Sequence, residues 1–220
     1  MTDIDRLYPP SYYRLHYRTD PRREAMYRQE RDRILRRVRA SGRILDVGCA
    51  VGGFLDCFDD HWEKWGIEPA TYAAHRCIEK GIRLIDPPIE PTGYWDVIVF
   101  RGSLQHVDRP LPYLAEAREA LRPGGLLAIL ATPNTHSLPY RLFRRLPALD
   151  PPRNFFVPSD AMLINALRNL RFRVLDVRYP YWGTPYASPA RDALRFAMAL
   201  AGFYRPFAWP GNMMEIYASV

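Results

Sequence analysis

The chain contains 220 residues, of which 48% are hydrophobic, 13% are aromatic and 25% are charged. This composition predicts one folded domain with appendages and excludes global disorder, because the apolar and aromatic residues suffice for a sizeable core. The net charge is +7, and residues 1–43 carry most of it, with twelve arginines against six acidic residues. A basic arm of this kind can bind phosphates, but without a nucleic-acid motif it is more typical of a solvated helix face.

Neither a membrane-spanning helix nor a disulfide framework is predicted. The longest apolar runs, at residues 124–132 and 193–203, are shorter than the roughly 20 residues that a bilayer requires. Residues 1–10 contain charges and prolines, so no signal peptide is expected. The three cysteines lack CxxC spacing, which predicts free thiols, a reducing compartment and a cytoplasmic location.

Residues 1–42 are predicted to form an N-terminal arm that is both aromatic and basic. Tyrosines crowd residues 8–17, and Asp20 followed by Pro21 is typical of a helix N-cap and first helical position. Apolar residues then recur at helical spacing to about residue 39, which predicts an amphipathic helix. The main domain is expected to cover residues 43–220.

From residue 43 onward, short apolar strands alternate with helical segments. Strands are predicted at residues 43–47, 63–68, 82–85, 95–100, 126–131, 172–178 and 213–219. Helices are predicted to begin at Gly53 and to cover residues 71–80, 111–121 and 159–170. This alternation predicts an α/β fold with a parallel sheet covered on both faces, and ligands at the carboxyl ends of the strands. Insertions at about residues 132–158 and 179–211 are expected to form a substrate cap.

The first predicted strand runs into a glycine-rich turn over residues 48–53. Glycines let the backbone approach a ligand closely, and a following helix offers free N–H groups. Glu68 ends the next strand about twenty residues later, where an acid can bind both hydroxyls of a ribose. Asp46 would repel the pyrophosphate of a dinucleotide, which disfavours a nicotinamide-dependent oxidoreductase. The same carboxylate suits the ammonium and sulfonium of S-adenosylmethionine.

From about residue 43 to residue 178 the chain resembles class I S-adenosylmethionine-dependent methyltransferases of the small-molecule type. Four segments carry the resemblance: Asp46-Val47-Gly48-Cys49-Ala50-Val51-Gly52, Ile67-Glu68-Pro69, residues 94–107, and Leu121-Arg122-Pro123-Gly124-Gly125-Leu126-Leu127. The family implies a Rossmann-like, seven-stranded, mostly parallel sheet whose last strand is antiparallel, with helices on both faces. It also implies that S-adenosylhomocysteine is the product.

The resemblance implies a set of cofactor-binding residues. They are Asp46, Gly48, Cys49, Ala50, Gly52, Glu68, Pro69, Asp86, Phe100, Arg101 and Ser103. Ala50 stands where a glycine is common in the family. Asp86 either lies near the adenine amino group, as an acid often does in the family, or caps the turn before Pro87. Arg101 is expected to contribute backbone contacts.

Methyl transfer requires a nucleophile held in line with the methyl group, and an oxygen nucleophile gains from a general base. His106 is the first candidate for this base, because it follows the fourth strand at the mouth of the cleft; the alternative is a neutral structural histidine. His136 is the weaker candidate. No spacing of histidines and acids suggests a metal site, so metal-independent activity is expected.

Several residues are candidates for the substrate site or for a lid. Tyr12, Tyr13 and Tyr17 either form a lid, as N-terminal segments often do in the family, or simply pack together. Asn134, Tyr181 and Trp182 lie in the insertions and are expected to face the acceptor. Residues 179–211 form a substrate wall, a homodimer contact or, through residues 189–205, a peripheral membrane contact.

The leading hypothesis is an O-methyltransferase that acts on a small acceptor. The later half resembles bacterial methyltransferases of saccharide and secondary-metabolite pathways, so a sugar hydroxyl is the first choice. The alternatives are N-methylation of an amino sugar or other amine, and a non-catalytic S-adenosylmethionine-binding module. A nucleic-acid acceptor is disfavoured, because no Asn/Asp-Pro-Pro-Tyr motif follows the fourth strand.

Overall fold

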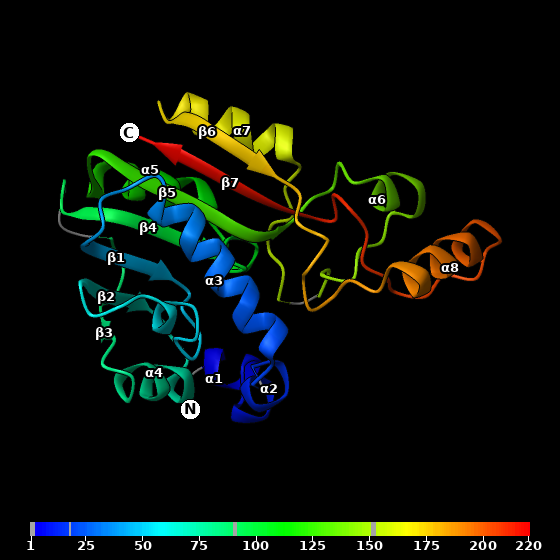
Figure 1. Cartoon of the computed structure of the whole chain (residues 1–220), viewed down its shortest axis with the longest axis horizontal. Helices are drawn as coiled ribbons and strands as arrows, with labels where there is room; N and C mark the ends of the chain where they lie inside the picture. Colours follow the sequence, from blue (N-terminus) through cyan, green and yellow to red (C-terminus); the bar gives the residue numbers. More distant parts are fainter. Residues whose placement is uncertain (1–2, 18, 90–91, 151–152) are drawn as a thin grey trace.

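Seven strands form one sheet in the order β3-β2-β1-β4-β5-β7-β6 (Figure 1). The computed structural model describes residues 3–17, 19–89, 92–150 and 153–220. The strands are β1 (Gly42–Val47), β2 (Trp62–Ile67), β3 (Arg83–Leu84), β4 (Trp95–Arg101), β5 (Leu121–Pro133), β6 (Arg173–Arg178) and β7 (Met213–Ser219). Strand β7 runs antiparallel to both of its neighbours, β5 and β6, whereas the other neighbouring pairs are parallel. The predicted Rossmann-like sheet with an antiparallel last strand is therefore confirmed.

Helices cover both faces of this sheet. They are α1 (Asp3–Leu7), α2 (Pro10–His16), α3 (Pro21–Leu35), α4 (Thr71–Ile78), α5 (Pro110–Ala120), α6 (Leu138–Phe143), α7 (Asp160–Asn169) and α8 (Pro189–Leu200). Alternate residues of β1 face opposite ways, so Leu45 packs with α5 and α7 while Ile44 packs with α3 and α4. The predicted N-caps form, since Asp20 accepts a hydrogen bond from the backbone of Arg22 and Ser159 accepts one from Met162.

Two predicted elements differ in the structure. The glycine-rich turn leads into a 3-10 helix of three residues, Leu55–Cys57, and the α-helix predicted to begin at Gly53 does not form. Gly52 has a φ of +73° and is followed by a second glycine, so the backbone here has little preference for a helix. Strand β5 begins at Leu121, five residues earlier than predicted, and its pairing with β4 shifts register near Trp95.

Helix α3 is part of the main core, although the sequence placed it in a separate arm. Its residues Met26, Tyr27 and Ile34 are buried among side chains of the sheet. Arg33 on α3 also forms a 3.0 Å ion pair with Glu215 of β7. The helix that precedes residue 42 therefore closes one face of the sheet.

The two insertions leave the sheet at the same side (Figure 1). They carry α6 and α8, which contact each other through aromatic rings: the centroids of Phe143 and Phe196 are 5.8 Å apart. Phe196 also stacks on Trp209 at 4.5 Å, and Phe207 is buried in the same cluster. Across the part of the chain that the structure describes, no helix is long and apolar enough to cross a membrane.

Candidate cofactor and acceptor site

The glycine turn packs tightly against the two strands that flank β1. The N–H groups of Gly48 and Cys49 both donate to the carbonyl of Ile67, at 2.8 and 3.2 Å, which ties the turn to the end of β2. A Cβ atom on Gly48 would lie 2.6 Å from the Cβ of Ser103, so only glycine fits beside the segment that follows β4. Ala50 has a φ of +49°, a left-handed conformation that explains why glycine is common at this position.

Asp46 carries a buried carboxylate that lacks a full set of partners. The side chain is 2% exposed, and within the described residues its Oδ1 atom accepts no hydrogen bond. Burial raises the pKa of Asp46 to about 7, while the nearby Arg101 guanidinium opposes that rise. A buried acceptor without a partner fits a cationic ligand group such as the ammonium of S-adenosylmethionine.

Glu68 is held rigidly just after β2. Its two carboxylate oxygens accept hydrogen bonds from the N–H groups of Ala50 and Ala70, each at 2.9 Å. The hydroxyl of Tyr13 donates to the same carboxylate at 3.3 Å. Burial raises the pKa of Glu68, and these hydrogen bonds oppose the rise. Each carboxylate oxygen has more than one lone pair, so the group can also accept from the hydroxyls of a ribose.

The other predicted cofactor residues differ in how far they are exposed to solvent. Cys49 is buried, with its Sγ 3.5 Å from the Sγ of Cys77, whereas Pro69 and Asp86 are exposed. Phe100 packs in the core, so only its backbone faces the strand end. The Oγ of Ser103 is buried and lacks a hydrogen-bond partner among the described residues.

Arg101 directs its side chain toward α3. Its Nε lies 2.6 Å from Oε2 of Glu30 on α3, and both side chains are almost fully buried. The guanidinium also lies 4.2 Å from the centroid of the Tyr27 ring. Glu30 was not predicted as a site residue, although it is an acidic residue on the otherwise apolar face of α3 that includes Met26 and Ile34.

His106 ends a 3-10 helix, Leu104–His106, after β4. Its Nδ1 lies 2.8 Å from the carbonyl oxygen of Arg153, and because a carbonyl only accepts, Nδ1 carries the proton. The basic nitrogen is then Nε2, which lies 3.4 Å from the amide nitrogen of Gln105. Burial lowers the pKa of His106 below its usual 6.5, so the imidazole is neutral at pH 7.

The weaker candidate, His136, belongs to a different cluster at the start of α7. Its Nδ1 lies 2.7 Å from Oδ1 of Asp160, and its side chain is 56% exposed. Asn134 is buried in the same cluster, where its Oδ1 accepts from the backbone N–H groups of His136 and Asp160. The structure thus places Asn134 and His136 together at the start of α7.

Helices α1 and α2 lie over the strand ends that carry the cofactor residues. Tyr13 contacts Glu68 on one side, and Tyr8 lies 3.3 Å from Nδ1 of His106 on the other. Tyr12 packs between them, with its ring 5.2 Å from Tyr8 and 5.4 Å from Tyr13. Tyr17 extends the cluster, at 5.8 Å from Tyr13. The tyrosines of the arm therefore form a layer between the β2 end and the β4 end.

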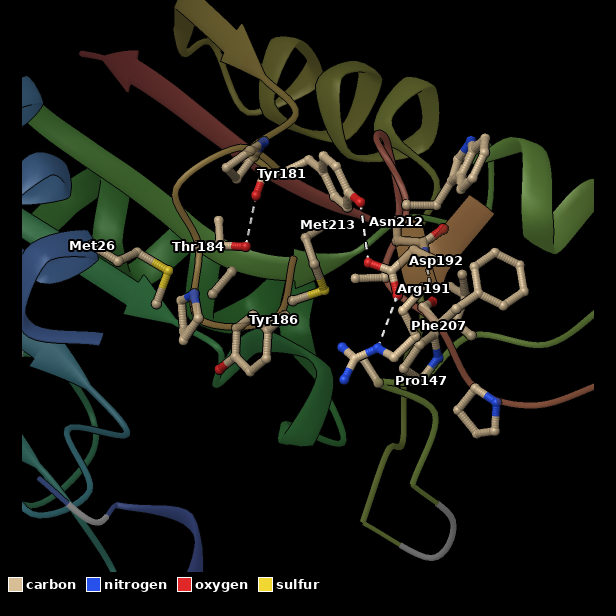
Figure 2. Close-up of a pocket in the computed structure, with 18 of the residues that line it drawn as sticks. Met26, Pro147, Tyr181, Thr184, Tyr186, Arg191, Asp192, Phe207, Asn212 and Met213 are labelled. Atoms are coloured by element: carbon tan, nitrogen blue, oxygen red, sulfur yellow. Dashed lines mark hydrogen bonds and ion pairs between the residues drawn. The ribbon is translucent and has the colours of Figure 1, made fainter. Parts of the chain in front are cut away.

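A cavity of about 530 Å³ lies between α3, the end of β5 and the second insertion (Figure 2). Met26 and Glu30 line it near the cofactor residues, and Figure 2 shows Tyr186 and Arg191 projecting between Met26 and the α8 region. Its wall is mostly apolar and includes four aromatic rings: Tyr181, Tyr186, Phe207 and Trp209.

Of the two candidate acceptor residues in the second insertion, one lines this cavity and the other does not. Tyr181 lines it and donates a 3.1 Å hydrogen bond to the buried Asp192. Trp182 is 74% exposed and does not line it. No group of three or more histidines, cysteines or acids suited to a metal ion occurs among residues 3–17, 19–89, 92–150 and 153–220.

Comparisons with known proteins agree with this architecture. A family model for the methyltransferase domain matches residues 17–177. The chain is 26% identical over 182 residues to a tRNA U34 carboxymethyltransferase from Desulfotalea psychrophila, covering 77% of this chain and 55% of that protein. It is 34% identical over 125 residues to a ubiquinone biosynthesis O-methyltransferase from Caulobacter sp. strain K31, covering 51% and 49%. The chain thus spans about half the length of these curated relatives.

Among solved structures, the chain is similar to a SAM-dependent methyltransferase from Archaeoglobus fulgidus. The two share 17% identity and superpose with a TM-score of 0.66 over 97% of this chain and 100% of that one. At this level of identity the likeness shows the fold.

Proposed function

We propose that this chain, which belongs to the class I S-adenosylmethionine-dependent methyltransferases, transfers a methyl group to a hydroxyl of a small, ring-containing acceptor. When bound, S-adenosylmethionine supplies a methyl group that its sulfonium activates. Asp46 would bind the ammonium of this cofactor, and Glu68 would bind the ribose.

The position of the cavity carries this proposal. Glu30 lines the cavity and pairs with Arg101, and Arg101 in turn approaches Asp46 through its backbone and its charge. The cavity therefore starts beside the cofactor residues and extends toward α8. An acceptor held in it would present one end to the strand ends, which is the positioning that a displacement reaction requires.

The lining of the cavity supports a particular acceptor chemistry. Aromatic rings such as Tyr186 and Trp209 pack well on flat or puckered rings, so a sugar-containing metabolite remains the first choice. A free sugar would leave many hydroxyls unpaired against prolines and aliphatic side chains, at a cost for each. We therefore propose an acceptor that joins its ring to an apolar portion.

A phenol is the second candidate acceptor. The apolar lining would accommodate it without unpaired hydroxyls, and one relative is named as a ubiquinone biosynthesis O-methyltransferase. Methylation of an amine is the third candidate reaction, and it depends less on a general base than methylation of a hydroxyl does. In all three reactions the chain orients the acceptor, and for an oxygen acceptor we assign proton uptake to the neutral imidazole of His106.

A nucleic-acid acceptor is not proposed, although one relative is named for tRNA. The arginines that follow the start of α3 are largely engaged within the protein: Arg33 pairs with Glu215, and Arg37 with Asp176 at 2.6 Å. Arg31 pairs with its neighbour Asp32 and also donates to the backbone. These contacts leave less positive charge for phosphates than the composition of the arm suggests.

The test is a transfer assay with methyl-labelled S-adenosylmethionine and four acceptor classes: glycosides with apolar aglycones, phenols, amines and tRNA. Labelling of a glycoside hydroxyl is expected. Tyr186→Ala should raise the KM for the acceptor by about tenfold and leave the Kd for S-adenosylmethionine unchanged, because the ring lines the proposed acceptor cavity.

Trp182→Ala is the matched control, since this exposed aromatic residue lies in the same insertion but outside the cavity. Labelling of amines or tRNA but of no hydroxyl would contradict the proposed reaction. An unchanged KM in Tyr186→Ala would contradict the proposed acceptor site.

A further inference from the structure

Helix α8 turns an apolar face toward solvent. Five residues at helical spacing share this face and are all exposed: Ala190, Ala193, Leu194, Ala197 and Leu200. Leu194 is 61% exposed and Leu200 is 62% exposed. The opposite side of the helix carries the fully buried acid Asp192. A helix packed on a globular core instead points its polar face toward solvent.

The neighbouring helix α6 extends the same surface. Leu138 and Leu142 are about half exposed, and Phe203, which follows α8, is 69% exposed. Ring contacts between Phe143 and Phe196 hold the two helices together. We refer to residues 138–147 and 189–209 as the α6–α8 tip. In Figure 1 this tip projects away from the sheet, beyond the ends of β5 and β7.

The α6–α8 tip is strongly basic. It contains six arginines: Arg141, Arg144, Arg145, Arg191, Arg195 and Arg205. All are exposed except Arg195, which is half-buried. Its single acid is the fully buried Asp192, which accepts hydrogen bonds from the Tyr181 hydroxyl and the Ser188 backbone and forms a 3.7 Å ion pair with Arg191. The near balance of charge over residues 44–220 thus hides a local excess of positive charge here.

We propose that the α6–α8 tip docks on an anionic lipid surface. Exposed leucine and phenylalanine side chains next to arginines match the two layers of such a surface, with apolar groups entering the acyl boundary and guanidinium groups binding lipid phosphates. A second copy of the chain is a poorer occupant, because two identical tips would bring their arginines face to face. A neutral apolar partner would supply no counter-charge for those arginines.

Docking would also orient the cavity. Arg191, Arg195 and Phe207 belong to the tip and line the cavity as well, so docking would hold the cavity close to the lipid surface, on the inner side of α8. An acceptor with an apolar portion could then enter from the bilayer; this step alone rests on the proposed function. The docking itself does not, and it is measured without turnover.

The test is flotation of the full chain with vesicles of phosphatidylcholine, with or without phosphatidylglycerol. Binding is expected only with the anionic lipid, and it should weaken as salt shortens the Debye length from ~10 Å at 0.1 M to ~3 Å at 1 M. The double variants Leu194→Ser/Leu200→Ser and Arg141→Gln/Arg205→Gln should each weaken binding by about tenfold.

Two exposed residues on other helices supply the matched controls: Leu111→Ser on α5 and Arg168→Gln on α7 should leave binding unchanged. Circular dichroism verifies the fold of every variant. The proposal fails if the chain does not float with anionic vesicles at low salt, or if the control variants weaken binding as much as the tip variants. It also fails if the tip variants change only the oligomeric state, because that result would assign the surface to a second copy.

Discussion

The carboxylate of Glu30 and the guanidinium of Arg101 form a 2.6 Å ion pair that joins α3 to the end of β4. The exposed fractions of the two side chains are 2% and 11%. The pair lies between the buried carboxylate of Asp46 and the cavity that we assign to the acceptor. The same ion pair therefore helps to hold α3 on the sheet and lies beside the candidate site.

Removing the negative charge of this pair should destabilise the protein. Glu30→Gln leaves Arg101 buried without its counter-charge, and the free energy of unfolding should fall by about 3 kcal/mol. Urea unfolding measures this change. Glu24→Gln on the same helix is the control, because its pair with Arg28 is half-exposed and should contribute less than about 1 kcal/mol. Equal effects of the two substitutions would contradict a structural role for the buried pair.

The affinity for S-adenosylmethionine should rise with pH. Burial raises the pKa of Asp46 to about 7, so the free protein holds a proton there below pH 7 and a carboxylate above it. An ammonium binds the carboxylate form, so affinity should increase by about tenfold between pH 6 and pH 8. Calorimetry at each pH measures this, and Asp46→Asn should flatten the profile. The same slope in wild type and variant would assign it to another group.

His106→Ala tests the proposed general base. The substitution should lower kcat by at least about 100-fold while the Kd for S-adenosylmethionine stays within about threefold. Because burial lowers the pKa of His106, the acid limb of the wild-type kcat profile should lie below pH 6.5. His136→Ala is the control, since that side chain is 56% exposed and bonded to Asp160. Near-normal turnover in His106→Ala would leave this residue a structural role only.

The arm should act as a lid over the cofactor. A variant lacking residues 1–19 loses Tyr13 but keeps Asp20 and with it the cap of α3. Its affinity for S-adenosylmethionine should fall by about tenfold, while its urea midpoint changes little. In the full chain, Leu15→Ser is the control, because Leu15 lies on the exposed side of α2. Unchanged affinity after the deletion would exclude a lid.

Much of the fold could be predicted because parallel strands are buried on both faces and read as continuous apolar runs. Strand β7, at Met213–Ser219, agrees with its prediction at both ends, and the antiparallel arrangement that the family resemblance implied is present. The α-helix expected after the glycine turn does not form, because Gly52 and Gly53 favour irregular backbone over helix. The sequence predicts an amphipathic helix at α3 but does not show which element its apolar face meets.

The position of the candidate site is also partly predictable. The sequence places Asp46, Gly48 and Glu68 at the ends of two neighbouring strands, and hydrogen bonds join the turn after β1 to the end of β2. Their role in binding S-adenosylmethionine stays a prediction. The cavity could not, because residues as distant as Met26, Tyr186 and Phe207 meet only through tertiary packing. Composition alone does not identify the residues of the cavity. Trp182 is an aromatic residue of the second insertion, but it is exposed and lies outside the cavity.

The central claim is that the strand ends around Asp46 and Glu68 bind S-adenosylmethionine. Calorimetric titration of the purified chain tests it most directly, with S-adenosylhomocysteine and NADH as parallel ligands. We predict a Kd on the order of micromolar for the first two and none for NADH, with binding lost in Glu68→Ala. A folded protein that binds neither S-adenosylmethionine nor S-adenosylhomocysteine would contradict the account, and binding of NADH alone would assign the glycine turn to a dinucleotide.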